Sequence, residues 1–90
     1  MITIDLFKPG FRFFLPNIDQ GSPFPGCRKI PKGYFLVQDV RRSFVANTGR
    51  PEYDIVVEVI KISKDGKQIG KYRYDYFIGF FMKHGVEYEN

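Results

Sequence analysis

The chain has 90 residues, 43% apolar and 27% charged, and a formal net charge of +4. This length predicts a single domain, 1–90, and the composition is typical of a globular chain and excludes a disordered one. No signal-peptide pattern occurs, and no apolar run reaches the roughly 18 to 20 residues that span a bilayer, so we expect a cytoplasmic protein without a membrane partner.

The residue types argue against catalytic and metal chemistry. One cysteine, Cys27, cannot form an internal disulfide, and with the single histidine, His84, it cannot complete a zinc site of three or four protein ligands. A cysteine–histidine nucleophile pair would have to meet in space, and nothing local resembles an activated thiol. The glycines stand singly, without a phosphate-cradling pattern. We therefore expect a protein that is not an enzyme and has no cofactor.

Apolar alternation and turn residues predict five strands. They are residues 2–7, 11–15, 33–46, 52–63 and 68–76. Pro9-Gly10, residues 47–49 and Asp65-Gly66 supply the turns between consecutive strands. The sequence thus predicts an all-β or β-rich domain, a small five-stranded antiparallel barrel or sandwich that is similar in outline to SH3-like or OB-like barrels.

Residues 77–84 predict a short C-terminal helix. Phe77, Phe80, Phe81 and His84 share one face at helical spacing, and Gly85 can end the helix. Gly79 weakens a helix by about 1 kcal/mol relative to alanine, so a strand continuing to Phe81 is the alternative.

The two hairpin turns also predict a register for the three central strands. A loop at 47–49 with a left-handed Gly49 places Leu36 opposite Ile60, Gln38 opposite Glu58, Val40 opposite Val56 and Arg42 opposite Asp54. A two-residue turn at Asp65-Gly66 places Val59 opposite Tyr72, Glu58 opposite Arg73 and Val57 opposite Tyr74. Charges of opposite sign then meet across the strands.

This register predicts one core face and one mixed face. The core face contains Phe35, Val37, Ile55, Val57, Val59, Tyr72, Tyr74 and Tyr76. The other face is charged, with an apolar end at Tyr34, Leu36, Ile60, Ile62 and Ile69 that the N-terminal hairpin is expected to cover. For the tyrosines of the segment KYRYDYF the core is favoured over the alternative, a platform on which nucleic-acid bases stack.

Basic residues form the first candidate site. Nine of them lack an obvious acidic partner in the sequence: Arg28, Lys29, Lys32, Arg41, Arg50, Lys61, Lys64, Lys67 and Lys71. The functional interpretation is a footprint for phosphates, and the alternative is an ordinary solvated surface.

The loop at 16–32, rich in proline and glycine, is the second candidate. Phe24 stands between two prolines beside Arg28 and Lys29 and could anchor a partner. Alternatively the loop wraps the domain and tucks Phe24 and Ile30 over an open end.

The sequence therefore predicts a binding module whose leading partner is nucleic acid, single-stranded nucleic acid included. The candidate residues are Phe24, Arg28, Lys29, Lys32, Arg41, Arg50, Lys61 and Lys71. The alternative is a small protein-binding adaptor or inhibitor of the phage or mobile-element type, which would use the proline-rich loop and an apolar patch. Whether the chain forms a homodimer is left open.

Overall fold

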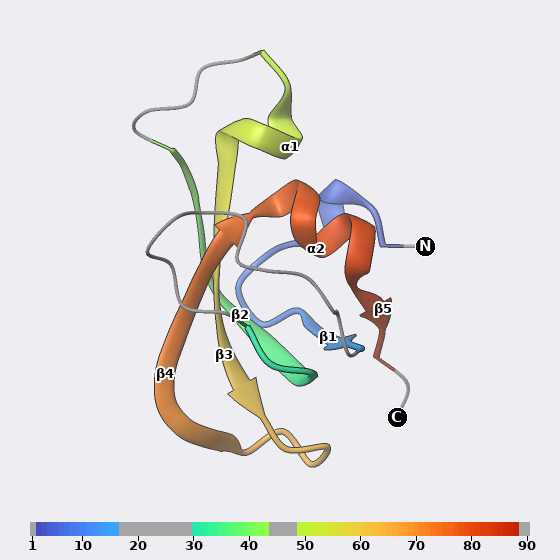
Figure 1. Ribbon diagram of the computed structural model, residues 1–90, viewed down its shortest axis with the longest axis vertical. Helices are drawn as coiled ribbons and strands as arrows, with labels where there is room; N and C mark the ends of the chain where they lie inside the picture. The colour runs from blue at the N-terminus through green and yellow to red at the C-terminus, as the bar shows by residue number, and fades with distance from the viewer. Residues whose placement is uncertain (1, 17–29, 44–48, 89–90) are drawn as a thin grey trace.

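A single antiparallel sheet dominates the computed structural model, which describes residues 2–16, 30–43 and 49–88 (Figure 1). The strands run in the order β4-β3-β2-β1-β5. They are β1 (Arg12–Leu15), β2 (Gly33–Arg42), β3 (Ile55–Ile62), β4 (Gln68–Phe77) and β5 (Val86–Glu87). The predicted β-rich fold is confirmed. Among the described residues β4 and β5 are the two edges of the sheet, so closure into a barrel is not observed.

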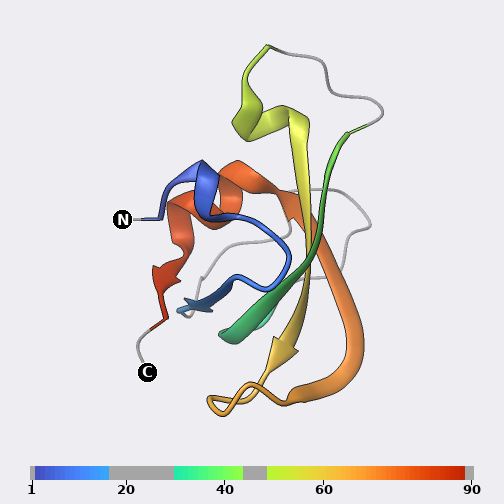
Figure 2. The ribbon, with the colours of Figure 1, turned by 180° about the vertical axis from the view of Figure 1, so that it is seen from behind.

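In the part of the chain that the structure describes, three short helices accompany the sheet. They are the 3-10 helix η1 (Ile4–Leu6), α1 (Pro51–Asp54) and α2 (Ile78–His84). The predicted C-terminal helix is confirmed by α2, which begins one residue later than expected. Figures 1 and 2 show η1 and α2 beside each other in two opposite views, and Phe7 contacts Phe81 with ring centroids 6.2 Å apart.

The prediction of a strand at 2–7 is wrong. The segment forms η1 instead, and the place beside β1 is taken by β5, which pairs Val86 with Phe14. Alternation of Ile2, Ile4 and Leu6 suggested one buried face, but Leu6 is exposed while Ile2 and Phe7 are both buried. One turn of helix lets side chains five residues apart reach the same core, which an extended segment does not do.

The turn at Pro9-Gly10 forms as predicted. Gly10 has a left-handed φ of 98°, and the Phe11 amide donates to the Lys8 carbonyl oxygen over 2.9 Å. The turn is held to β2, because the amide of Gly10 donates to the Val37 carbonyl oxygen. The adjoining predicted strand 11–15 is confirmed by β1.

The predicted register between β2 and β3 is right for one half of the hairpin. Leu36 faces Ile60 as expected, but an irregularity between Val37 and Asp39 shifts all later pairs by one residue. Arg42 therefore faces Ile55, and the expected pairing with Asp54 is wrong. A β-bulge of this kind inserts one unpaired residue, here within an exposed polar stretch that gives no hydrophobic signal.

The start of β3 also differs from the prediction of a strand over 52–63. Residues 51–54 form α1, where Pro51 stands in the first turn with its φ already suited to a helix. Asp54 is buried and accepts a hydrogen bond from the Gly49 amide over 3.1 Å. Gly49 has the predicted left-handed φ, 79°. Residues 44–46, predicted as the end of a strand, and 47–48, predicted as turn, lie outside the described residues.

The β3–β4 hairpin keeps its predicted faces but not its predicted pairs. The structure pairs Val57 with Tyr76, Val59 with Tyr74 and Glu58 with Asp75, two residues away from the expected register. A shift of two residues preserves which side chains share a face. A further irregularity near the turn sets four residues of β4, 69–72, against Lys61 alone. These four residues, here called the β4 bulge, are all exposed.

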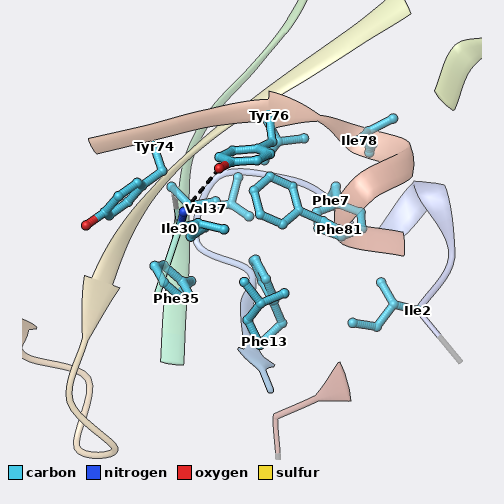
Figure 3. Close-up of a cluster of buried hydrophobic side chains, with 13 residues drawn as sticks. Ile2, Phe7, Phe13, Ile30, Phe35, Val37, Tyr74, Tyr76, Ile78 and Phe81 are labelled. Atoms are coloured by element: carbon cyan, nitrogen blue, oxygen red, sulfur yellow. Dashed lines mark hydrogen bonds between the residues drawn. The ribbon is translucent and has the colours of Figure 1, made fainter. Parts of the chain in front are cut away.

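Aromatic rings from both ends of the chain fill the core (Figure 3). Phe13 is fully buried, and its ring lies 5.2 Å from Phe81, 5.7 Å from Phe7 and 6.0 Å from Phe35. The Tyr76 hydroxyl accepts a hydrogen bond from the buried Ile30 amide over 3.1 Å. Ile30 is thus buried, as expected if the 16–32 loop wraps the domain, while Phe24, the other residue of that interpretation, lies outside the described residues.

Candidate nucleic-acid interface

The face of the sheet opposite the core, here called the outer face, carries the charged residues Asp39, Arg41, Glu58, Arg73 and Asp75. Arg12 and Phe14 of β1 lie opposite Leu36 and Tyr34 of β2 and share this face with them. The face continues across β3 with Ile62, Ile60 and Glu58, and across β4 with Arg73 and Asp75. It therefore has an apolar end and a charged end.

At the charged end, two arginines and three carboxylates form an ion-pair cluster. Arg41 Nη2 lies 3.0 Å from Asp75 Oδ2, and its Nη1 lies 3.3 Å from Asp39 Oδ2 and 3.8 Å from Glu58 Oε1. Arg73 Nη1 lies 3.5 Å from Glu58 Oε2. The irregularity between Val37 and Asp39 explains this arrangement, because the shift by one residue places Arg41 on the same face as Glu58 and Asp75.

The cluster changes the interpretation of Arg41. The sequence indicated no acidic partner for it, and this is wrong, because three carboxylates surround its guanidinium. Burial acts to lower the pKa of Arg41. The charge of Asp75, together with the hydrogen bonds that Arg41 donates to Asp75 and Asp39, outweighs burial and raises the pKa. The expected Glu58–Arg73 pair is present, although the two residues are diagonal neighbours.

The β3–β4 turn gathers basic residues at the other end of the molecule. The Gly66 amide donates to the Ser63 carbonyl oxygen, and Gly66 has a left-handed φ of 95°. The Arg12 guanidinium lies against Gly66, about 3 Å from where a Cβ atom would stand. Arg12, Lys64 and Lys67, here called the basic turn, are all exposed. Their only acidic neighbour within the turn sequence is Asp65.

A groove with aromatic walls adjoins the basic turn. Its lining residues are Phe14, Tyr34, Lys64, Val86 and Glu87, and its volume is about 330 Å³. The Phe14 and Tyr34 rings are 5.0 Å apart at an interplanar angle of 58°, and Tyr88 meets Tyr34 edge-on at 5.5 Å. The Tyr88 hydroxyl donates to the Lys64 carbonyl oxygen, which ties the C-terminal segment to the turn. We call this feature the aromatic groove.

The β4 bulge exposes two large side chains. Tyr72 and Ile69 are 50% and 47% exposed, while Tyr74 and Tyr76 are buried. The prediction of a core position is therefore confirmed for Tyr74 and Tyr76 and wrong for Tyr72. The bulge removes Tyr72 from the regular pairing, so it does not follow the alternation that buries the other two.

The structure separates the predicted site residues. Arg50 directly precedes α1, at the opposite end of the long axis from the β3–β4 turn that Lys61 and Lys71 flank (Figure 1). The Lys61 side chain lies over Gly33 and is half-buried, and Lys32 and Lys71 are exposed. Phe24, Arg28 and Lys29 lie outside the described residues.

Five residues of the candidate interface were missed by sequence reasoning: Arg12, Phe14, Tyr34, Val86 and Glu87. Arg12 and Phe14 belong to a strand read only for its buried positions, and Tyr34 was read as part of an apolar end. Arg12 and Phe14 alternate with the buried Phe13 and Leu15, and this was the available signal, because alternate strand residues face opposite sides.

A second cavity, of about 200 Å³, lies beside α1. Arg42, Gly49, Pro51, Asp54 and Ile55 line it. Asp54 is 2% exposed and already accepts the Gly49 hydrogen bond, so we interpret it as a residue that holds the turn before α1.

Metal-ligand groups and membrane-spanning helices are both absent from the described residues. Across residues 2–16, 30–43 and 49–88, no three His, Cys, Asp or Glu side chains are grouped to hold a metal ion. In the same part of the chain, no helix is long and apolar enough to cross a membrane.

Comparisons with protein-family models, with curated proteins and with solved structures find no match to this chain, so its function is inferred from the geometry alone.

Proposed function

We propose that this protein is a non-enzymatic nucleic-acid-binding module and that the basic turn contacts the phosphates. The observation that carries the proposal is the approach of Arg12, from β1, to the turn that holds Lys64 and Lys67. Residues far apart in the sequence thereby form one cationic surface. Lys61 and Lys71 flank it on the two strands of the hairpin.

The contrast with the ion-pair cluster supports this location. Among the described residues, ion pairs within 4.0 Å occupy Arg41 and Arg73, whereas none involves Arg12, Lys64 or Lys67. A cation already held by carboxylates releases few counterions when a phosphate approaches. The exposed cations of the basic turn release theirs, which favours binding and makes it depend on salt.

The proposal is tested by the salt dependence of oligonucleotide binding. Fluorescence anisotropy of a labelled single strand, measured from low to moderate salt, gives the slope of log K against log salt. For Lys64→Gln/Lys67→Gln we expect weaker binding and a slope that is shallower by about 1.4, since each single-strand phosphate contact contributes about 0.7. The matched control is Lys8→Gln/Lys83→Gln, which removes the same charge from exposed positions outside the turn.

Two results would contradict the proposal. The first is the absence of binding by the native protein even at low salt, which would favour the alternative of a protein-binding adaptor or inhibitor. The second is equal slopes for the basic-turn variant and its control, which would mean that net charge, and not this surface, drives association.

A further inference from the structure

We infer that the aromatic groove holds an unpaired base of a single strand, so that the protein selects single-stranded over double-stranded nucleic acid. This inference rests on the proposed function, because it takes the basic turn as the phosphate contact. It adds a second element of recognition, made by Phe14 and Tyr34, that charge alone does not provide.

The groove has the composition of a base-binding site. At about 330 Å³ it falls at the small end of the range typical of ligand pockets, roughly 300 to 1,000 Å³. Two half-buried rings, Phe14 and Tyr34, form part of its wall. Their other contacts hold them in place, because Tyr34 packs against both Phe14 and Tyr88. Rings that are fixed in this way can stack on a base without losing conformational freedom.

The charges around the groove indicate the orientation of the strand. Lys64 belongs both to the groove and to the basic turn, so the two surfaces are continuous. Glu87 lines the groove from β5 and would repel a phosphate there. We therefore place the backbone along Lys64 and Arg12, and the base in the groove between Phe14, Tyr34 and Val86.

This arrangement requires a base that is free to leave its stack. In a duplex the faces of the bases are covered by their neighbours, and extruding one base costs several kcal/mol. In a single strand the same base can turn toward an aromatic side chain at little cost. The basic turn alone would bind both forms, whereas the groove would favour only the single strand.

The first test uses the native protein and three labelled oligonucleotides of equal length. These are a single strand, its duplex, and a single strand with abasic positions, which keeps the phosphates but lacks the bases. We expect the complete single strand to bind roughly 5- to 150-fold more tightly than the abasic strand for each base that stacks. Equal affinity for the complete and the abasic single strand would overturn the inference and leave the proposed function intact.

The second test locates the base. Tyr34→Leu removes a groove ring, and Tyr34→Phe keeps it; we expect the first to reduce single-strand affinity roughly 5-fold or more and the second to retain it. Duplex affinity and the salt slope should be unchanged in both. Tyr72→Leu is the matched control, because Tyr72 is half exposed but belongs to the β4 bulge and not to the groove.

The outcomes separate the inference from the proposed function. If Tyr34→Leu weakens single strand and duplex equally, or if Tyr72→Leu is the variant that loses single-strand selectivity, the groove is not the base site. Circular dichroism of each variant shows whether it is folded, and the abasic comparison on the native protein decides the question if Tyr34→Leu does not fold. Failure of the native protein to bind any of the three oligonucleotides would refute the proposed function itself.

Discussion

On the inner face of the sheet, the rings of Phe13, Phe35 and Tyr76 are enclosed by other rings and by α2, whereas on the outer face Phe14 and Tyr34 are covered only in part. Phe13 and Phe14 are neighbours in the sequence and illustrate the difference. One is fully buried against Phe81, and the other lines a groove.

The comparison shows that residue type does not separate the enclosed aromatics from those for which we propose a role in binding. Position relative to cations does, because the outer rings line a groove together with Lys64 while the inner rings meet other apolar groups. We therefore expect changes on the inner face to act on stability alone, and changes to the rings of the aromatic groove to act on binding.

The largest expected effect on stability tests the inner face. Tyr76→Phe removes the hydroxyl that accepts a hydrogen bond from the buried Ile30 amide. An unsatisfied buried donor lowers the free energy of unfolding by about 1–3 kcal/mol. Tyr34→Phe, on the outer face, should leave the free energy of unfolding unchanged within about 0.5 kcal/mol. Urea unfolding followed by circular dichroism measures both. Equal losses for the two variants would contradict the assignment of the faces.

The next effect separates backbone strain from side-chain contact in the basic turn. Gly66→Ala and Gly10→Ala each place a Cβ at a left-handed position, which costs about 1–2 kcal/mol. A Cβ at Gly66 would stand 2.9 Å from an Arg12 nitrogen, whereas at Gly10 it would meet nothing within 4 Å. We expect similar losses of stability, measured by urea unfolding, but weaker oligonucleotide binding for Gly66→Ala alone.

The pattern of apolar residues predicts which face of the sheet a side chain occupies, but it does not predict the register of the strand pairs. The faces of β3 and β4 were predictable, since alternation survives any shift by an even number of residues, and Val57, Tyr74 and Tyr76 are buried as expected. The register was not, because a bulge adds residues without disturbing the apolar pattern on either side of it. Residues 2–7 misled because Ile2, Ile4 and Leu6 alternate as in a strand, whereas one helical turn buries Ile2 and Phe7, which alternation would place on opposite faces.

The candidate site was predictable only in its local part. The positive charge of the β3–β4 hairpin is visible in the sequence, and so is the Glu58–Arg73 pair. The approach of Arg12 to Gly66 and the packing of Tyr88 on Tyr34 depend on how distant segments fold together. The partners of Arg41 depend on a bulge that the sequence does not announce.

A smaller effect is expected from removing one of the three carboxylates that surround the two arginines of the ion-pair cluster. Glu58→Gln removes the carboxylate that Arg41 and Arg73 share, and because its side chain is 18% exposed we expect a loss of stability of up to about 1 kcal/mol. The two arginines would then be less neutralised, so the salt slope of oligonucleotide binding should steepen by up to about 0.7, the contribution of one phosphate. Asp5→Asn removes the same charge elsewhere and should leave the slope unchanged; an equal change in both would show an effect of net charge only.

The smallest effect concerns the single histidine, which lies in the last turn of α2 with its ring 4.8 Å from Phe80. Burial, and then the charge of Lys83, lower the pKa of His84 below its ordinary value of 6.5. The unfolded chain therefore takes up a proton before the folded chain as the pH falls through 6.5, and the free energy of unfolding decreases. A His84→Gln variant should therefore show a flatter profile of unfolding free energy against pH between pH 7.5 and 5.5, measured by urea unfolding. An equal decrease in the variant would assign the pH dependence to other groups.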